Sequence, residues 1–418
     1  MKKPPLLFLC HRIPYPPNKG DKIRSFHLLH HLSQHFDIHL GSFVDDPQDW
    51  PWAPEVEKFC CSMLLRPLQS WRATIRSLRG LLSGEALSVP YYADRTMQRW
   101  VTQTIASHDI RHAIVYSSAM AQFLPLEGAG FERKVIDFVD VDSDKWAQYA
   151  AQKLPPMRWV YQREARCLLR LEKILARRFD AGLFVSSTEA ELFRQLSPVT
   201  AHKIGFYNNG VNCQYFQPDS NRDTAPANPF AGGSRPLVFT GAMDYWPNVD
   251  AVIWFADSVL PGLRRTHPDL DFYIVGGSPT RAVRQLERRP GVKVTGRVPD
   301  VRPYLQHSLA AVAPMRIARG VQNKVLEGMA MARPVLVSSK GLEGIAAKDG
   351  VEILLADSPD DYARLVGELL AGKHPGLGER ARRCVQRNFN WDNNLPEVVF
   401  LLGRGEMTAR LSSVQSYG

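Results

Sequence analysis

The stretch that decides the fold is residues 313–339, APMRIARGVQNKVLEGMAMARPVLVSS. It contains an apolar strand end, a basic glycine-containing loop, a helical pattern over about residues 321–332 and a second apolar strand. This order is typical of a βαβ unit in a parallel sheet. The loop brings Arg316, Arg319 and backbone amides to a helix N-terminus, where unpaired N–H groups and the helix dipole favour phosphate. With Lys324 nearby, the stretch predicts a phosphate site beside a parallel sheet.

The alternation of strands and helices continues on both sides of this stretch. Apolar runs of strand length lie at residues 6–10, 38–44, 113–117, 135–141 and 182–186, and again at 237–241, 272–276, 292–296, 310–314 and 334–338. Each half therefore predicts a doubly wound parallel sheet, and the polar segment 217–235 predicts a linker. Ligands bind beyond the carboxyl ends of such strands. We expect an α/β protein of two facing Rossmann-like domains, with its chemistry in the cleft between them.

The composition is that of an ordinary folded protein with an excess of basic residues. The 418 residues are 44% apolar and 22% charged, which excludes a disordered chain and a membrane bundle. The formal net charge of +10 favours anionic partners. The six cysteines form no CxxC pair, so neither a zinc site nor a disulfide framework is predicted.

The apolar runs are too short to target or span a membrane. The run at residues 6–10 is shorter than the apolar region of a signal peptide, and no stretch approaches the roughly 18 apolar residues of a spanning helix. We expect a cytoplasmic protein that touches membranes only from the surface.

One face of the predicted helix carries an amide and a carboxylate. Glu327 follows Asn323 by four residues, so the two side chains share a face. The carboxylate of Glu327 could accept hydrogen bonds from a ribose diol. The alternative is a solvated helix face on which Lys324 and Glu327 are neighbours by chance, and spacing alone does not decide between them.

The segment around Glu327 resembles the donor domain of the family 4 glycosyltransferases. Residues 327–335, EGMAMARPV, match the second half of the family's Glu-x7-Glu signature, whose second Glu binds the nucleotide ribose. Arg319 stands where the first Glu is expected. The family's contact from that Glu to the donor sugar is therefore not carried over.

Three further segments match the same family in chain order. Residues 208–216 resemble the segment where the chain crosses between domains, and residues 294–305 resemble the segment whose backbone holds the nucleotide base. Glu343-Gly344 matches a common Glu-Gly pair. The resemblance implies the two-domain GT-B fold.

The phosphate contacts implied by the resemblance depart from the family pattern. Many members carry an Arg and a Lys after the strand at residues 237–241, but residues 240–248 contain no basic residue here. Arg316, Arg319 and Lys324 are predicted to replace them, while Asn248 either caps the next helix or faces the donor. The predicted donor-binding set is Gly20, Arg24, Asn248, Arg297, Val298, Arg316, Arg319, Gly320, Asn323, Lys324 and Glu327.

A Pro-rich loop after the first strand supplies the first two members of that set. Residues 11–29, HRIPYPPNKGDKIRSFHLL, lead into a helix, and Gly20 allows close backbone approach to a ligand. Family members carry glycines and an Arg here, beside the donor phosphates, and Gly20 with Arg24 match that pattern. The alternative is a turn into a helix with no ligand.

An acidic loop, Asp140-Val-Asp142, follows another predicted strand. It resembles the Asp-x-Asp metal motif of the other large glycosyltransferase fold, but the predicted phosphate site is already built from cations. Helix capping by Asp142 or Ser143 is another interpretation. We predict that Asp140 and Asp142 bind the acceptor, that no metal is needed, and that Arg319 and Lys324 complete the catalytic set. With NKGDKIR upstream, the loop resembles the sugar transferases associated with exosortase (PEP-CTERM) systems.

Two basic stretches favour contact with an anionic lipid surface. One is a stripe of basic residues at three-four spacing, and the other interleaves apolar and basic residues. The stripe is Arg163, Arg166, Arg170, Lys173 and Arg177, and the second stretch is Trp71, Arg72, Ile75, Arg76, Leu78 and Arg79. Solvated helix faces are the alternative.

These observations predict a retaining, hexosyl-type glycosyltransferase that uses a nucleotide-sugar donor and no cofactor. Its acceptor would be a glycan or a polyprenyl-linked lipid of exopolysaccharide or cell-surface polysaccharide assembly, and nucleic acid is excluded as a partner. Residues 1–208 would form the acceptor-side domain and residues 209–390 the donor domain, with a helix over about residues 391–418 packing back on the first. A nucleotide-sugar epimerase and a non-catalytic scaffold are the alternatives.

Overall fold

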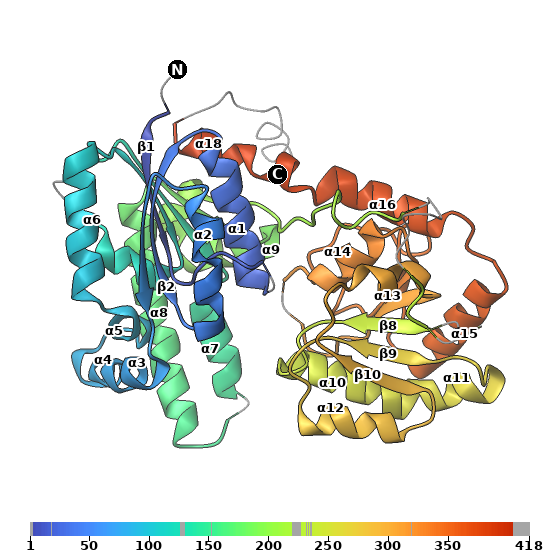
Figure 1. The fold of residues 1–418 in the computed structure, drawn as a ribbon. Coiled ribbons are helices and arrows are strands. Elements are labelled where there is room, and N and C mark those ends of the chain that lie inside the picture. Colours follow the sequence, from blue (N-terminus) through green and yellow to red (C-terminus); the bar gives the residue numbers. More distant parts are fainter. Residues whose placement is uncertain are drawn as a thin grey trace. The chain divides into compact units, whose positions relative to one another are not determined.

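The computed structural model contains two compact units, each built around its own parallel sheet (Figure 1). The structure describes residues 3–17, 19–125, 130–151, 153–219, 227–230, 232, 234, 236–318 and 320–403. The first unit comprises residues 1–208 and 394–418, and the second comprises residues 209–393. No helix of the described residues is long and apolar enough to cross a membrane.

The first unit has a seven-stranded sheet in the order β3-β2-β1-β4-β5-β6-β7. Its strands are β1 Pro5–Cys10, β2 Asp37–Val44, β3 Ser62–Pro67, β4 His112–Tyr116, β5 Arg133–Val139, β6 Ala181–Phe184 and β7 Ile204–Phe206. Its helices are α1 Gly20–Ser33, α2 Ala53–Glu57, α3 Ser70–Ser77, α4 Arg79–Ser83, α5 Ser88–Tyr92, α6 Arg95–His108, α7 Asp142–Ala151, α8 Met157–Arg178, α9 Ser187–Leu196 and α18 Pro396–Leu401. The central strands are buried almost throughout, as expected for a parallel sheet with both faces covered.

The second unit has a six-stranded sheet in the order β10-β9-β8-β11-β12-β13. Its strands are β8 Leu237–Thr240, β9 Phe272–Val275, β10 Val292–Gly296, β11 Ala310–Ala313, β12 Val335–Val337 and β13 Leu354–Leu355. Its helices are α10 Trp246–Trp254, α11 Leu260–Thr266, α12 Arg281–Gln285, α13 Arg302–His307, α14 Asn323–Ala330, α15 Pro359–Leu370 and α16 Leu377–Asn388, and α17 Trp391–Asn394 spans the division between the units.

The predicted linker over residues 217–235 packs on the second unit wherever the structure describes it. Asp219 N–H donates to Gln306 Oε1 at 3.2 Å, and Gln306 Nε2 donates to the Asp219 carbonyl at 3.0 Å. Phe230 is buried, edge-on to Tyr273. The linker prediction is wrong for these residues. The segment is polar overall, but its one buried aromatic residue, Phe230, attaches it to the second unit.

The chain returns to the first unit after α16. Asn394 Nδ2 donates to the Asn208 carbonyl at 3.1 Å, and α18 belongs to the first unit. Of the predicted helix over residues 391–418, the described part forms α17 and α18, and residues 404–418 lie outside the described residues.

A buried ion pair joins α1 to the middle of the first sheet. Arg24 and Asp137 have no exposed surface. Arg24 donates to the two carboxylate oxygens of Asp137 at 2.9 and 3.2 Å and to the Tyr207 carbonyl at 2.9 Å. The prediction that Arg24 contacts donor phosphates is wrong, because its guanidinium is enclosed and bonded within the protein.

Two buried carboxylates hold the loop that follows β5. Val139 has a φ of 71°, which is strained for a β-branched residue. The N–H of Val141 donates to Glu189 at 2.7 Å, and the N–H and hydroxyl of Ser143 donate to Glu172 at 3.1 and 2.6 Å. Burial raises the pKa of Glu172 to about 7, although the bonds from Ser143 oppose the shift.

We expect Asp137→Asn to lower the free energy of unfolding by about 3–5 kcal/mol, because it leaves the Arg24 charge buried without a partner. Asp109→Asn is the control, since Asp109 forms an exposed pair with Arg111 that contributes about 1 kcal/mol at most. Urea denaturation of the three proteins measures both changes, and equal losses would contradict a special role for Asp137.

The raised pKa of Glu172 predicts a pH-dependent stability. Because this pKa is about 7 in the folded protein and about 4.3 in an unfolded chain, the folded protein binds the proton more tightly. The free energy of unfolding should therefore fall as pH rises from about 5 to about 7. Glu172→Gln cannot ionise and should show a smaller fall. Denaturation curves across this range test it, and identical slopes for the two proteins would contradict it.

Candidate functional site

The strand order of the second unit reverses between β8 and β11. The chain builds outward through β9 and β10 on one side, and through β12 and β13 on the other. In open parallel sheets ligands bind at such a reversal, beyond the carboxyl ends of the strands. The segments that follow β8 and β11 are therefore the candidate site.

The backbone at the end of β8 is tightly enclosed. Gly241 has a φ of 153°, and its N–H donates to the Val275 carbonyl at 3.1 Å. A Cβ on Gly276 would lie only 1.7 Å from the Gly241 carbonyl oxygen. No side chain fits at this crossing, so the ends of β8 and β9 approach each other closely.

Asn248 and Lys324 meet beside Gly241. A Cβ built on Gly241 would lie 2.8 Å from Asn248 Nδ2 and 3.5 Å from Lys324 Cε. Asn248 Nδ2 donates to the Ala242 carbonyl at 2.9 Å, while its Oδ1 is buried without a hydrogen-bond partner. Asn323 Oδ1 is buried and unpaired as well. Two acceptor oxygens of this region are therefore available to a ligand's hydroxyl groups.

Lys324 and Glu327 are half-buried neighbours on α14 that interact electrostatically. Lys324 Nζ donates to Gln322 Oε1 at 3.2 Å and lies 5.3 Å from the centre of the Phe239 ring. Burial lowers the pKa of Lys324 to about 8, although Glu327 opposes the shift. Burial also raises the pKa of Glu327, against the charge of Lys324 and a hydrogen bond from Thr240. An anion placed beside Lys324 would restore its full charge.

In the second unit, the described arginines of the predicted donor-binding set do not join Asn248, Lys324 and Glu327. Arg316 pairs with Asp250 on α10 through two hydrogen bonds, one of them 2.9 Å long, so a carboxylate already offsets its charge. Arg319 lies outside the described residues, and Gly320 follows it with a φ of 67°. Arg297 is exposed after β10, the strand on the far side of β9 from β8.

Val298 is half-buried and packs against the core of the second unit, so its backbone is fixed. Helix α14 begins at Asn323 and ends at Ala330, slightly inside the predicted range. The structure brings Asn248, Lys324 and Glu327 together at the strand-order reversal.

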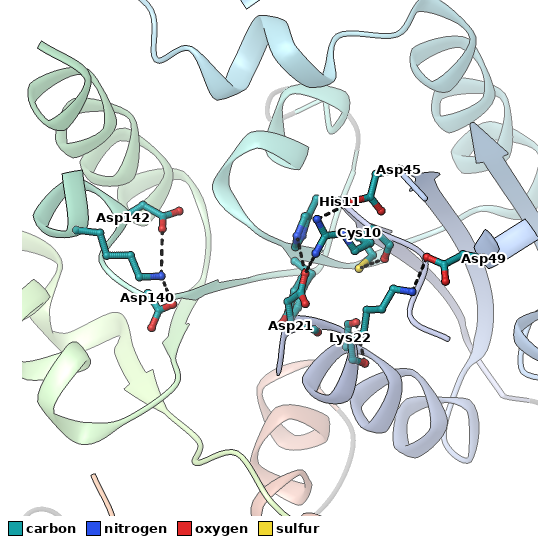
Figure 2. A network of polar contacts seen from close by, with 12 residues as sticks. Cys10, His11, Asp21, Lys22, Asp45, Asp49, Asp140 and Asp142 are labelled. Carbon is teal, nitrogen blue, oxygen red and sulfur yellow. Dashed lines mark hydrogen bonds and ion pairs between the residues drawn. The ribbon is translucent and has the colours of Figure 1, made fainter. Parts of the chain in front are cut away.

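Asp140 and Asp142 face each other at the carboxyl end of β5, with one ammonium between them (Figure 2). Lys145 bonds directly to Asp140 and lies 3.7 Å from Asp142. Among the described residues, no group of three His, Cys, Asp or Glu side chains is arranged to hold a metal. Helix α7 begins at Asp142, so Ser143 lies inside its first turn and not at the N-cap, and its N–H and hydroxyl donate to Glu172.

A second polar network, not predicted from the sequence, lies where the first sheet reverses its order, between β1 and β4. Arg12 bridges Asp21 and Asp45 at 2.6 and 2.7 Å. His11 stacks on Tyr116 with ring centres 5.7 Å apart, and its Nε2 lies 3.5 Å from Asp21 (Figure 2). Burial opposes ionisation of Asp21, but His11 and Arg12 hold its pKa well below the usual range.

Three residues of this network, His11, Arg12 and Asp21, come from the segment that contains Gly20. Gly20 itself is exposed at the first position of α1. The signal in the sequence was the pair His11-Arg12 directly after an apolar strand. The resemblance to the family favoured Gly20 and Arg24 instead, because these two residues match the family pattern.

Comparison with known proteins finds a family model that matches part of the second unit. Residues 234–372 match the family model described as "Glycosyl transferases group 1". A curated relative is the D-inositol 3-phosphate glycosyltransferase of Nocardiopsis dassonvillei, 27% identical over 224 residues, which cover 50% of this chain and 52% of that protein. The chain therefore matches about half the length of this relative.

Solved structures of similar fold cover nearly the whole chain. Sucrose-phosphate synthase from Thermosynechococcus elongatus has a TM-score of 0.67 at 16% identity and covers 99% of this chain and 100% of its own. Anabaena HepE in complex with UDP and glucose has a TM-score of 0.64 at 14% identity, covering 96% and 99%. WaaG, a glycosyltransferase involved in lipopolysaccharide biosynthesis, has a TM-score of 0.64 at 15% identity, covering 96% and 100%.

These likenesses confirm the predicted fold class, α/β with two Rossmann-like parallel-sheet domains of the GT-B type. Over residues 234–372, which include the candidate site of the second unit, the chain is similar to the group 1 glycosyl transferases.

Proposed function

We propose that the protein is a retaining, hexosyl-type glycosyltransferase that moves a sugar from a nucleotide-sugar donor to a glycan or lipid-linked acceptor. One observation carries this proposal. Asn248 and Lys324 meet at the enclosed backbone of Gly241, and Glu327 accepts a hydrogen bond from the adjacent Thr240, at the strand-order reversal and inside the segment that matches the group 1 family model.

The donor is proposed to bind with its diphosphate beside Lys324 and its ribose beside Glu327. Lys324 provides a cation that an anion would keep charged, and the Glu327 carboxylate can accept hydrogen bonds from two ribose hydroxyls. HepE has been solved with UDP and with UDP-glucose, which supports a nucleotide sugar as the donor class. Arg297 and Val298 would then lie beside the nucleotide base.

Retention follows if the acceptor attacks the face of the sugar from which the diphosphate leaves. The bond between C1 and the phosphate oxygen breaks, the bond from C1 to the acceptor oxygen forms, and the acceptor's proton passes to the departing phosphate. The main contribution of the protein would be electrostatic stabilisation of that phosphate.

The structure changes the proposed division of charge between the basic residues. Because Asp250 offsets Arg316, we assign the main role to Lys324, with Arg319 as its partner. Arg316 would contribute only after release from Asp250.

Asp140 and Asp142 are proposed to bind acceptor hydroxyl groups without a metal. Lys145 lies between the two carboxylates, where a divalent ion would otherwise sit. Its charge offsets part of theirs, and the remaining carboxylate oxygens can accept hydrogen bonds from a sugar.

The proposed setting is exopolysaccharide or cell-surface polysaccharide assembly of the exosortase (PEP-CTERM) type. The acidic loop and the NKGDKIR segment support it through their resemblance to that subgroup. The protein would act in the cytoplasm, at the inner face of the cell membrane.

Lys324→Ala should weaken a nucleoside diphosphate about 10- to 100-fold and leave the matching nucleoside nearly unchanged, because a charge-assisted contact contributes about 1.5–3 kcal/mol. Lys373→Ala, at an exposed lysine of the second unit, is the control. Calorimetric titration with the nucleotides selected by a thermal-shift screen measures both. Affinity of the unaltered protein for the diphosphate should also fall above about pH 8, as Lys324 loses its proton.

Equal losses for nucleoside and diphosphate would place Lys324 away from the phosphates. Conversion of a sugar nucleotide without any acceptor would indicate an epimerase. Failure of every nucleotide to bind, with Glu327 intact, would indicate a non-catalytic scaffold.

Asp140→Asn or Asp142→Asn should lower turnover or acceptor affinity while donor affinity stays within about threefold, a change below 1 kcal/mol. Transfer should survive EDTA, because Lys324 and Arg319 supply the charge that a metal would bring. Asp144→Asn, at a neighbouring carboxylate of α7, is the matched control. Transfer that EDTA abolishes and manganese restores would overturn this assignment.

A further inference from the structure

Helix α3 turns its large apolar side chains toward solvent. Trp71, Ile75 and Leu78 lie at i, i+4 and i+7, on one face of the helix, and are 63%, 59% and 54% exposed. Leu81, in α4, is 40% exposed. Large apolar residues arranged in this way are unusual on a soluble surface and typical of an interaction site.

Small residues occupy the opposite, inward face. Ala73 and Ser77 are buried, and a Cβ on Gly80 would contact Leu87 and Pro90 at 3.3 Å. On the same side Arg76 donates to the carbonyls of Pro90 and Tyr91 at 3.2 and 2.6 Å. Rotation of the helix that buried Trp71 and its neighbours would break these contacts. Their exposure follows from the packing.

A second exposed apolar segment adjoins the first. Leu154, Met157 and Trp159, at the start of α8, are 83%, 46% and 65% exposed. Arg163, one turn after Trp159, donates to the carbonyl of Gly80. This bond attaches the first turns of α8 to α4, so both segments lie at the same end of the first unit (Figure 1).

The surroundings of these side chains are basic. Residues 68–84 and 145–163 contain no Asp or Glu. Arg72, Arg158 and Arg166 are exposed, and the guanidinium of Arg72 lies 5.0 Å from the centre of the Trp71 ring. Tryptophan and arginine side by side are characteristic of the interface between water and lipid.

We propose that this basic aromatic face, formed by Trp71, Arg72, Ile75, Leu78, Arg158, Trp159 and Arg166, docks on the surface of an anionic lipid bilayer. The positive charge of this face favours a lipid surface over a second copy of the chain as its partner. A second copy would bring one set of arginines against another, whereas an anionic headgroup layer complements them and accepts the apolar side chains beneath it. The sequence predicted lipid contact in general, and the proposal assigns it to this defined surface. Vesicle binding tests it independently of the proposed transferase activity, because it needs neither donor nor acceptor.

The full chain should co-sediment with vesicles that contain phosphatidylglycerol and should not bind vesicles of phosphatidylcholine alone. Arg72→Gln, Arg158→Gln and Arg166→Gln together should lower the partition coefficient roughly a hundredfold, since each basic residue contributes about fivefold at an anionic surface. Trp71→Ser with Trp159→Ser should lower it about tenfold or more. All five residues are exposed, so folding should be preserved.

Two matched controls distinguish a docking face from general attraction. Arg281→Gln, Arg284→Gln and Arg288→Gln remove the same charge from exposed positions of the second unit, and Val199→Ser removes an apolar side chain that is 72% exposed elsewhere in the first. Neither should change binding by more than about twofold. The proposal fails if the unaltered chain does not bind anionic vesicles, if neutral vesicles bind equally well, or if the control triple variant loses as much. A dimer that the tryptophan variant abolishes would identify a second copy as the occupant.

Discussion

Strand direction is the constraint on which both units depend. Every pairing between named strands is parallel, so within each sheet all carboxyl ends share one edge. Polar segments that are distant in sequence are therefore neighbours there. In the second unit this brings Gly241 near Lys324, and in the first it places His11 beside Tyr116, one strand away from the loop that carries Asp140. The reversal of strand order leaves space at that edge in each unit.

Buried charges hold helix α1 and the acidic loop in place at this edge of the first unit. Arg24 ties α1 to β5 through Asp137, and Lys22 is paired with Asp49 at 2.6 Å. Glu172 orders the acidic loop from a neighbouring helix. Each of these groups loses hydration on folding, which is tolerable only because its partner is in place. The sequence alone therefore does not decide the role of an arginine such as Arg24, four residues after a loop glycine. The same residue can bind a ligand's phosphate or form a buried ion pair that holds the fold together.

Sequence patterns predicted every interior strand but only one of the four edge strands, β10, and few of the contacts between side chains. Every predicted strand is present, whereas β3, β7 and β13 were missed. β7 and β13 have only three and two residues, too few for a recognisable apolar run, and β3 is only half-buried. In the candidate site of the second unit, Lys324 and Glu327 could be proposed from the sequence because helical spacing and a local motif define them. The pairing of Arg316 with Asp250 could not be predicted, because it joins residues 66 positions apart, one in the loop after β11 and the other on α10. The bond of Lys145 to Asp140 was missed, although it is local.

The outward-facing apolar side chains of α3 also bear on how the chain behaves in bulk solution. In water without lipid, each molecule exposes indole and aliphatic surface that can adhere to another molecule. Electrostatic repulsion between the arginines around Trp71 is what separates two such faces, and its range shortens from about 10 Å at 0.1 M salt to about 3 Å at 1 M. Colloidal stability should therefore decline as ionic strength rises, the reverse of proteins whose association is driven by opposite charges. Concentrated salt would strip this protein from an anionic surface and at the same time promote its self-adhesion.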